Sequence, residues 1–510
     1  MAIVKKRTES VKEVHPLRVH FLPLPGIGQK RECFRKKQPF RERRGSPTIG
    51  DAADAAYPKW KLGVILVKKK SLAAVLSISL AAFALSACGN GNNSSSNSSS
   101  NSSNSTAAPS PTTATEPAAA QPASGEKAQL TYAIWDSNQE KGLRTIADEF
   151  EAKNPDIKVN IEVTGWSDYW TMLEAGATGG SLPDVFWMHS NEIYRYASNG
   201  MLLDLTDRIS KSADVKLENY PEGLNQIYNL NGKQYAVPKD FDTIGLWYNK
   251  TLFDQAGIQH PDENWTWDDL KQAAKTLTKD GVYGFLAPLH NQEGYYNFVY
   301  QNGGTIITAD KKSGYDDPKT IEALDFYIGL VREGLSPEVY GDAERADLLK
   351  NGKAAMGLFG SWNLSGFTEN EYMAKNFDVA VLPKKEKQAS IYNGLGNAID
   401  AKTKHPEEAW KFVEYLSSKA GQERQAELGV AISAYTGAAD KWVDSNKTFN
   451  IKAFVDMVSY GVIRPYSNTT AVWEDKAYEA LKPAFSGKVP VEEAAKNAAK
   501  VMNESLAEEK

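Results

Sequence analysis

The sequence QYAVPKDFDTIGLWYNKTLFDQAGI, residues 234–258, determines how the rest of the chain is arranged. Its first part predicts a short strand that ends near Pro238, and an apolar run at residues 244–248 predicts a strand that leads into a helix. Asp240 and Asp242 lie between these runs, and side chains at i and i+2 of an extended segment face the same way. We interpret the stretch as a crossing between two α/β lobes. An ordinary loop with two solvated aspartates is the alternative.

Strands and helices alternate on both sides of this crossing, which predicts the α/β class. Before it, we expect strands at residues 130–135, 157–163 and 184–188, and helices at residues 143–150, 168–177 and 192–198. After it, we expect helices at residues 252–256, 321–332 and 406–417, and strands at residues 354–359 and 379–382. Thr266 and Asp269 predict a capping box, and residues 393–399 predict a return crossing. Residues 441–508 predict helices with breaks near Pro465, Pro483 and Pro490.

The N-terminal segment differs from the rest of the chain in its charge. Residues 1–70 hold 18 Lys and Arg against 6 Asp and Glu, whereas the whole chain has a net charge of −5. A nucleic-acid-binding arm has such a composition. We instead expect residues 1–66 to come from an over-extended gene model, with the native chain starting at Val67. The reason is that a secretory signal follows them, and such a signal has to emerge early.

Residues 67–87 have the pattern of a secretory signal peptide. Three lysines precede fifteen mostly apolar residues, which are too few to span a bilayer comfortably. The end of the segment, Leu85-Ser86-Ala87-Cys88, resembles the lipobox of bacterial lipoproteins. This resemblance implies that lipid, such as palmitate, is attached to Cys88 and anchors the protein in the cell membrane. A chance buried cysteine is the alternative.

Residues 88–127 predict a disordered tether. Gly, Asn and Ser dominate its first part and Thr, Ala and Pro its second, so there is little apolar surface to bury. As a coil it would span roughly 35 Å. Since the only other cysteine is Cys33, the exported domain should contain no disulfide, which oxidising compartments permit but do not require.

From residue 128 to about 505 the chain resembles a known family, and its motifs occur in the family's order. These are the strand at Trp135, the run Pro183-Asp-Val-Phe-Trp187, residues 235–253 with Tyr-x-x-Pro and Trp-Tyr-Asn-Lys-x-Leu-Phe, residues 354–362, the helix at 406–416, and Trp473. The family is that of the carbohydrate-type extracellular solute-binding proteins of bacterial ABC importers, which includes maltodextrin-binding protein.

The resemblance implies a two-lobed periplasmic-binding-protein-like α/β fold with crossing hinge strands and a helical C-terminal region. We expect the first lobe to comprise residues 128–241 and 393–432, and the second residues 242–392 and 433–510. It also implies a substrate-binding component of an ABC transporter that captures a sugar or oligosaccharide between the lobes. The transmembrane subunits of a permease would receive the ligand. We expect an extracytoplasmic monomer without catalytic activity, cofactor, metal or nucleic-acid partner.

A sugar site needs flat aromatic platforms and groups that bond hydroxyls, preferably charged ones. Trp362, after the turn Gly360-Ser361, and Trp473 resemble the family's stacking positions. Asp242 matches its hinge carboxylate, with Asp240 beside it. First-lobe contacts are expected from Trp187, Ser190 and Asn191, where related maltodextrin binders carry charge, so the ligand stays open. Further candidates are Tyr296, Trp166, Asn138, Gln139 and Arg464, whereas Trp135 and Trp247 are expected in the core.

Two other functions remain open from the residues. A secreted glycoside-active enzyme could use two carboxylates, and Asp240 and Asp242 would lie about 7 Å apart on one strand, within the range that glycosidases use. A binder of a non-sugar solute such as a peptide is the other, and the aromatic richness disfavours it. The chain has no G-x-S-x-G, H-E-x-x-H or P-loop motif. No histidine pair has metal spacing, and His189 is expected to be structural.

Overall fold

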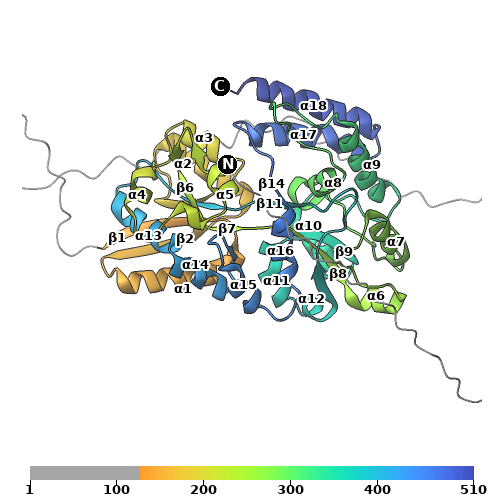
Figure 1. The fold of residues 1–510 in the computed structure, drawn as a ribbon, viewed down its shortest axis with the longest axis horizontal. Helices are drawn as coiled ribbons and strands as arrows, with labels where there is room; N and C mark the ends of the chain where they lie inside the picture. The colour runs from red at the N-terminus through yellow and green to blue at the C-terminus, as the bar shows by residue number, and fades with distance from the viewer. Residues whose placement is uncertain (1–126, 510) are drawn as a thin grey trace, which may run out of the picture. The chain divides into compact units, whose positions relative to one another are not determined.

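The computed structural model describes residues 127–509, and a five-stranded sheet organises the first lobe (Figure 1). Its strand order is β2-β1-β3-β12-β6. The strands are β1 (Ala128–Ile134), β2 (Ile157–Val163), β3 (Val185–Met188), β6 (Ala236–Pro238) and β12 (Gly396–Ile399). Strand β1 is parallel to β2 and β3, as the strand–helix–strand order predicts, and β12 is antiparallel to β3 and β6.

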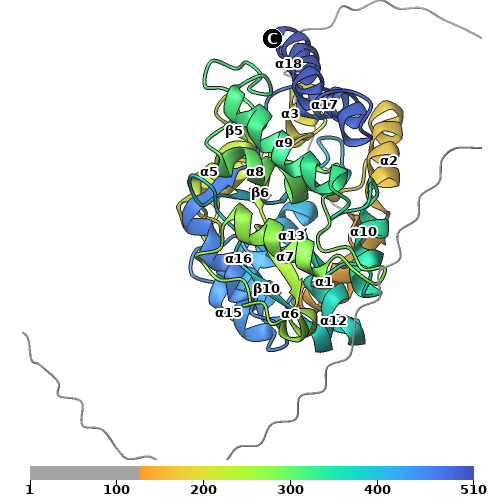
Figure 2. The ribbon, with the colours of Figure 1, turned by 90° about the vertical axis from the view of Figure 1, so that its right-hand side faces the viewer.

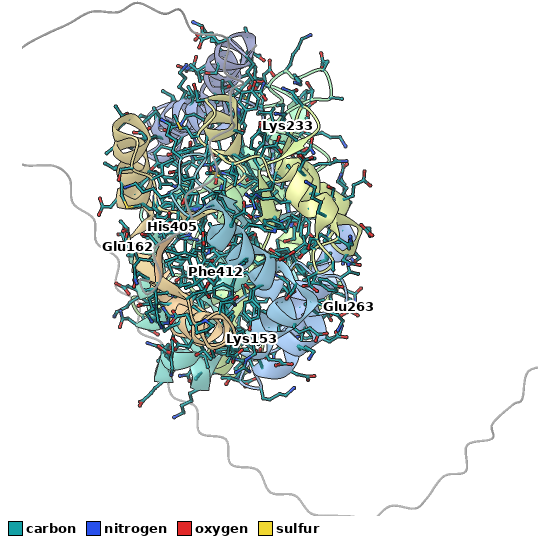
Figure 3. The ribbon with its side chains drawn as sticks, turned by 90° about the vertical axis from the view of Figure 1, so that its left-hand side faces the viewer. Lys153, Glu162, Lys233, Glu263, His405 and Phe412 are labelled. Carbon is teal, nitrogen blue, oxygen red and sulfur yellow. The ribbon has the colours of Figure 1, made fainter. Side chains whose placement is uncertain are left out.

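Helices pack around this sheet, and the long ones α1 and α13 bury apolar side chains. They are α1 (Ser137–Lys153), α2 (Trp166–Gly179), α3 (Ile193–Ser198), α4 (Thr206–Lys211), η1 (Leu217–Asn219), α5 (Glu222–Ile227), α13 (Pro406–Ser417) and α14 (Lys419–Glu427), with a hairpin of β4 (Asn229–Leu230) and β5 (Lys233–Gln234). Phe412 of α13 packs against Tyr132 and Phe150, with ring centroids 5.2 and 5.1 Å apart (Figure 3). Residues 406–417 are thus a helix, as predicted.

A three-stranded antiparallel sheet organises the second lobe. Its order is β10-β8-β9, from β8 (Ile244–Asn249), β9 (Met356–Gly360) and β10 (Phe377–Ala380). Its helices are α6 (Lys250–Ala256), α7 (Trp267–Leu277), the π-helical turn η2 (Asn291–Tyr295), α8 (Tyr296–Gln301), α9 (Pro318–Arg332), α10 (Asp342–Lys350), η3 (Ser361–Asn363), α11 (Leu364–Glu369) and α12 (Glu371–Asn376). The capping box of Thr266 and Asp269 is confirmed.

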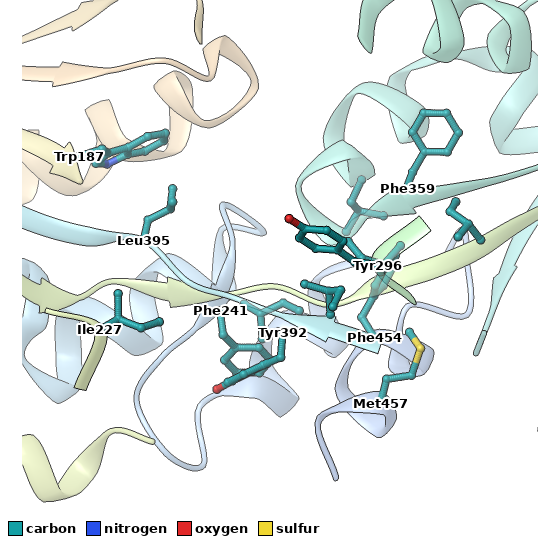
Figure 4. Packing of buried hydrophobic residues seen from close by; sticks show 14 of the residues in the cluster. Trp187, Ile227, Phe241, Tyr296, Phe359, Tyr392, Leu395, Phe454 and Met457 are labelled. Atoms are coloured by element: carbon teal, nitrogen blue, oxygen red, sulfur yellow. The ribbon is translucent and has the colours of Figure 1, made fainter. Parts of the chain in front are cut away.

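The chain crosses between the sheets through short paired strands. Strand β7 (Asp240–Phe241) pairs with β13 (Ile432–Ser433), and β11 (Ser390–Tyr392) pairs with β14 (Gly461–Ile463). Asp242 and Asn393 form an antiparallel bridge beside them. Phe241 and Tyr392 pack together on these segments, with ring centroids 5.5 Å apart (Figure 4). Residues 393–399 therefore return to the first sheet as predicted.

The C-terminal part is mainly helical, and its helices are interrupted near Pro465 and Pro490 as predicted. It contains α15 (Ala439–Ser445), α16 (Lys452–Asp456), η4 (Met457–Tyr460), α17 (Thr470–Phe485) and α18 (Val491–Ala507), and α17 and α18 pack against α9 (Figure 2). Strand β14 lies within the stretch expected to be helical. The break predicted near Pro483 comes after Phe485, because α17 runs two residues past this proline. Pro483 removes the hydrogen bond that position 483 would donate to the carbonyl of Glu479, and the helix ends two residues later.

Several expectations lie outside the described residues. These are the gene-model segment 1–66, the signal peptide 67–87, Cys88, and the tether except for its last residue. Within residues 127–509, no helix combines the length and the apolar character needed to cross a bilayer. The boundaries given above for the two lobes stay predictions.

Candidate functional site

The two aspartates of the crossing segment take different partners. Asp242 is 9% exposed, and its Oδ1 accepts a hydrogen bond of 2.8 Å from Nε2 of Gln292. Burial and the nearby charge of Asp240 raise the pKa of Asp242 well above its usual value, while Arg464 acts in the opposite direction. Asp240 instead forms an ion pair with Lys239, 2.6 Å from Nζ to Oδ2, and accepts from the backbone N–H of Leu395. Among the described residues, no ammonium or guanidinium is bonded to Asp242.

Arg464 follows β14 and reaches the same region. Its Nη2 donates to Oε2 of Glu474 at 2.7 Å, and Oε1 of Glu474 accepts from the hydroxyl of Tyr296 at 3.3 Å. Arg464 is 4% exposed, yet its Nε and Nη1 have no hydrogen-bond partner among the described residues. A buried guanidinium with two free donors is costly unless something accepts from it. This cluster can therefore bond oxygen atoms of a ligand.

The first lobe contributes a polar run after β3. Nδ1 of His189 lies 2.7 Å from Oδ1 of Asn191, and Nε2 lies 3.1 Å from Nδ2 of Asn393. Burial and the charge of Arg464 lower the pKa of His189 to about 3, so the imidazole is neutral at physiological pH. The side-chain oxygens of Ser190 and Asn393 are buried without a partner among the described residues. The predicted contacts Ser190 and Asn191 thus lie near Arg464.

The tryptophans of the first lobe divide into core and surface. Trp187 is fully buried in β3, and its Nε1 donates to the hydroxyl of Tyr132 at 2.7 Å. Trp135 is partly buried, and its ring centroid lies 5.0 Å from Trp187 and 5.1 Å from Trp166. Trp166 is 40% exposed and lies 5.3 Å from the His189 ring. Trp166 therefore offers the accessible aromatic surface of this cluster, while Trp187 has the surroundings of a core residue.

Trp362 lies in a turn whose geometry is fixed from several sides. Glu293, in η2, accepts from the backbone N–H of Gly360 at 2.5 Å and from Nδ2 of Asn363 at 3.0 Å, and it forms an ion pair with Arg345. The indole of Trp362 lies over Gly360, where a Cβ would come within 1.9 Å of Cζ3. Trp362 is partly buried. Glycine at position 360 is therefore needed for this placement of the ring.

Trp473, the other predicted platform, is fully buried in α17. Its Nε1 donates to Oγ of Ser467 at 2.9 Å. Its neighbour Glu474 is the residue that points to Arg464. The next residue on the other side, Val472, is 46% exposed. A ligand contact of Trp473 stays a prediction, in surroundings that are those of a core residue. Trp247 is fully buried as expected, 4.8 Å from Phe367 and 4.9 Å from Phe449 between ring centroids.

The first turn of α1, which holds the candidates Asn138 and Gln139 expected in a loop, lies against the second lobe. Asn138 is exposed, and its backbone N–H and Nδ2 both donate to Oδ1 of Asp136 at 2.9 Å. A Cβ at Gly366 in α11 would lie 3.5 Å from Oδ1 of Asn138. Gln139 is 4% exposed and accepts from Nζ of Lys239. The candidates of this turn are thus linked to the crossing segment.

His290, Glu293 and Asp342 place ligand atoms within 4.8 Å of one another, as a metal site would. Arg345 forms ion pairs with both carboxylates, however, and Nδ1 of His290 accepts from the backbone N–H of Glu293. The guanidinium already compensates the negative charge that would attract a cation. The arrangement is therefore that of a structural ion-pair cluster.

The structure brings Asp242, Arg464 and Tyr296 together with four residues that sequence reasoning did not select. These are Gln292, Glu474, Asn393 and Lys239. The polar run Asn291-Gln292-Glu293 before an aromatic pair is a signal that could have indicated Gln292. Glu474 was not selected because its neighbour Trp473 is the residue of this segment that resembles a family position.

Comparison with known proteins gives the family. The profile of the bacterial extracellular solute-binding protein family matches residues 135–423. The chain is 26% identical to the maltodextrin-binding protein MdxE of Bacillus subtilis over 402 residues, 77% of this chain and 93% of that protein. It is 24% identical to the multiple sugar-binding protein of Streptococcus mutans over 351 residues, 64% of this chain and 80% of that protein.

A solved structure agrees with this assignment. An ABC substrate-binding protein of Listeria monocytogenes, in complex with cycloalternan, is 27% identical and superposes with a TM-score of 0.69. The match covers 75% of this chain and all of that one. It confirms the predicted two-lobed fold with crossing strands, and the sequence matches confirm the predicted resemblance. The chain belongs to the family of bacterial extracellular solute-binding proteins.

Proposed function

We propose that this protein is the substrate-binding component of an ABC importer and captures a neutral sugar or oligosaccharide between its lobes. The transmembrane subunits of a permease would then take up the ligand. The observation that carries this proposal is the cluster of Asp242, Gln292, Arg464, Glu474 and Asn393 at the crossing strands, with free donors on Arg464 and a free acceptor on Asn393. The relatives named for sugar binding support the ligand class.

The charges in this region favour a neutral ligand. Lys239 pairs with Asp240, Arg464 with Glu474, and Arg345 with Glu293. Each cation is thus already matched by a carboxylate, and Asp242 adds a further acid. Among residues 127–509, an anionic sugar would meet no unmatched positive charge there, whereas a hydroxyl can donate to a carboxylate and accept from the guanidinium.

Ligand binding should draw the lobes together. Arg464 and Asp242 lie on the crossing segments, Trp166 and Asn191 on the first lobe, and Trp362 on the second. A sugar that contacts both lobes shifts the open–closed equilibrium by its difference in affinity for the two forms. We place the lobe boundaries as predicted above, at residues 241/242, 392/393 and 432/433.

We propose that the protein is not an enzyme and that it binds its ligand outside the cytoplasm. A glycosidase needs two carboxyl groups free to act as acid and nucleophile or base, and Asp240 is held by Lys239 and by the N–H of Leu395. The family is an extracellular one. The signal pattern of residues 67–87 and the lipobox-like end at Cys88 support a lipid anchor in the cell membrane, with residues 88–127 as the tether and a monomeric head.

Glu192 lies at the edge of this region, and the pKa of its carboxyl group is raised. It is 7% exposed and precedes α3, and its Oε2 lies 3.2 Å from Nε of Arg195 without forming a hydrogen bond. Burial raises the pKa of Glu192 to about 7, Arg195 lowers it, and the carboxylates of Glu174, Asp475 and Glu474 raise it further. The last two belong to α17, so like charges meet at this edge.

The proposed function is tested with a thermal-shift panel of the purified protein. Maltotriose, galactooligosaccharides and lactose are compared with glucuronic acid, amino acids and peptides. A ligand that binds only the folded state raises the melting temperature. At a free concentration of a hundred times Kd, it raises the free energy of unfolding by about 2.7 kcal/mol. We expect at least one neutral sugar to do so. The carbohydrate assignment is wrong if only amino acids or peptides do. Recovery of the sugar unchanged after incubation checks that there is no turnover.

Trp362→Ala should weaken binding of that sugar about ten- to a hundredfold, because an aromatic platform contributes roughly 1–3 kcal/mol. The ligand-free melting temperature should change little. Gly360→Ala should weaken binding similarly, because its Cβ would displace the indole. Trp247→Ala is the matched core control and should cost about 3–5 kcal/mol of stability. Calorimetric titration measures the affinity for the sugar, and urea unfolding measures the stability. A large stability loss in Trp362→Ala would show that this ring belongs to the core.

Glu192→Gln should flatten the pH dependence of stability. Because the folded state holds the Glu192 proton more tightly, its contribution is full below about pH 4.5 and is lost as pH rises to about 7. The wild type should therefore lose up to about 1.4 kcal/mol per pH unit, relative to the variant, within this window. Urea unfolding at pH 5, 6, 7 and 8 measures this. Glu263→Gln, at an exposed position, is the control. Equal slopes for wild type and Glu192→Gln would refute the assignment.

A further inference from the structure

Lys239 is the most deeply buried lysine of the crossing region, and its ammonium has three neighbours. The residue lies between β6 and β7 and is 1% exposed. Its Nζ lies 2.6 Å from Oδ2 of Asp240, donates to Oε1 of Gln139 at 3.1 Å, and lies 4.3 Å from the ring centroid of Trp187. Because a solvated ammonium is strongly favoured over a buried one, its place here requires these partners.

The bond to Gln139 fixes the direction of an amide. An ammonium can only donate, so Gln139 must present its oxygen to Lys239 and its nitrogen to the other side. That nitrogen donates to Oδ2 of Asp136 at 3.1 Å. Oδ1 of Asp136 in turn accepts from the backbone N–H and the side chain of Asn138. A continuous series of hydrogen bonds thus connects Lys239 to the first turn of α1.

The backbone of Lys239 is held just as firmly. Its N–H donates to the carbonyl of Leu395 at 2.7 Å, and its own carbonyl accepts from Nε2 of Gln425 in α14 at 2.8 Å. Leu395 also donates its N–H to Oδ1 of Asp240. Because the backbone at Lys239 is fixed, its ammonium can hold the first turn of α1 against the crossing segment.

We propose that Lys239 is a positioning residue for ligand binding, which orients Gln139 and, through Asp136, Asn138 at the first-lobe side of the site. It also neutralises Asp240, so that Asp242 is the carboxylate left to accept from a ligand hydroxyl. Lys239 does not touch the ligand, because it is enclosed by these residues. The inference rests on the proposed function, since Gln139 and Asn138 matter only if a ligand binds there.

The test is a double-mutant cycle between Lys239→Met and Gln139→Ala. Affinity is measured by calorimetric titration with maltotriose. If maltotriose does not bind, the sugar that raises the melting temperature most in the panel replaces it. Lys239→Met alone should weaken binding about tenfold or more, as expected for loss of a charge-assisted hydrogen bond. In the Gln139→Ala background the same change should cost much less, because residues acting through one another are not additive. Lys271→Met removes an ammonium paired with Glu333 elsewhere and is the control.

Urea unfolding separates positioning from a purely structural role. The variant Lys239→Met/Asp240→Asn removes the unpaired buried carboxylate and serves if Lys239→Met does not fold. Positioning predicts that this variant regains stability but binds more weakly than Asp240→Asn alone. Unchanged affinity in Lys239→Met, fully additive effects with Gln139→Ala, or equal affinity of the double variant and Asp240→Asn would overturn the inference. If no sugar binds the wild type, the proposed function itself fails, and this inference with it.

Discussion

The ion pair between Arg464 and Glu474 is the contact on which the site depends, because it holds a cation almost out of solvent where the chain crosses between its sheets. A buried guanidinium is tolerated only when carboxylates and hydrogen-bond acceptors surround it. Glu474 supplies the charge, and Asp242 lies near enough to interact. Two nitrogens of Arg464 nevertheless keep free donors. The same group stabilises the crossing, and we propose that a bound ligand supplies the acceptors for its two buried donors.

Two other cations of this region are compensated in the same local way. Lys239 sits against Asp240 and Trp187, and Arg345 against Glu293 and the ring of Phe359. The contacts of Lys239 with Trp187 and of Arg345 with Glu293 join segments that are about fifty residues apart in the sequence. Paired charges of this kind make a site polar without giving it a net field, which suits a ligand rich in hydroxyls. They also link the proposed ligand contacts on both lobes to the strands about which the lobes would move.

Much of the fold could be predicted from the sequence, and less of the site. Strand–helix alternation indicated the α/β lobes, and the run around Asp242 indicated the crossing, because hydrophobic periodicity reflects local burial. In a strand that is buried on both faces, the hydrophobic pattern does not show which way a tryptophan side chain points. Trp187 could therefore not be distinguished from a residue that lines a cleft. Trp473 shows the same difficulty on a helix. Lys239 and Gln139 are a hundred residues apart, and nothing local in either segment indicates that they meet. A proline pattern does not fix the last residue of a helix, so the end of α17 two residues after Pro483 could not be located from the sequence.

A crystal structure of the protein with its sugar tests the central claim most directly. We expect sugar oxygens within hydrogen-bonding distance, about 2.7–3.2 Å, of both the Asp242 carboxylate and the free nitrogens of Arg464. We also expect Lys239 to remain bonded to Gln139 and Asp240 and to make no contact with the sugar. A sugar bound away from the crossing strands, with Arg464 satisfied by protein groups alone, would contradict the account.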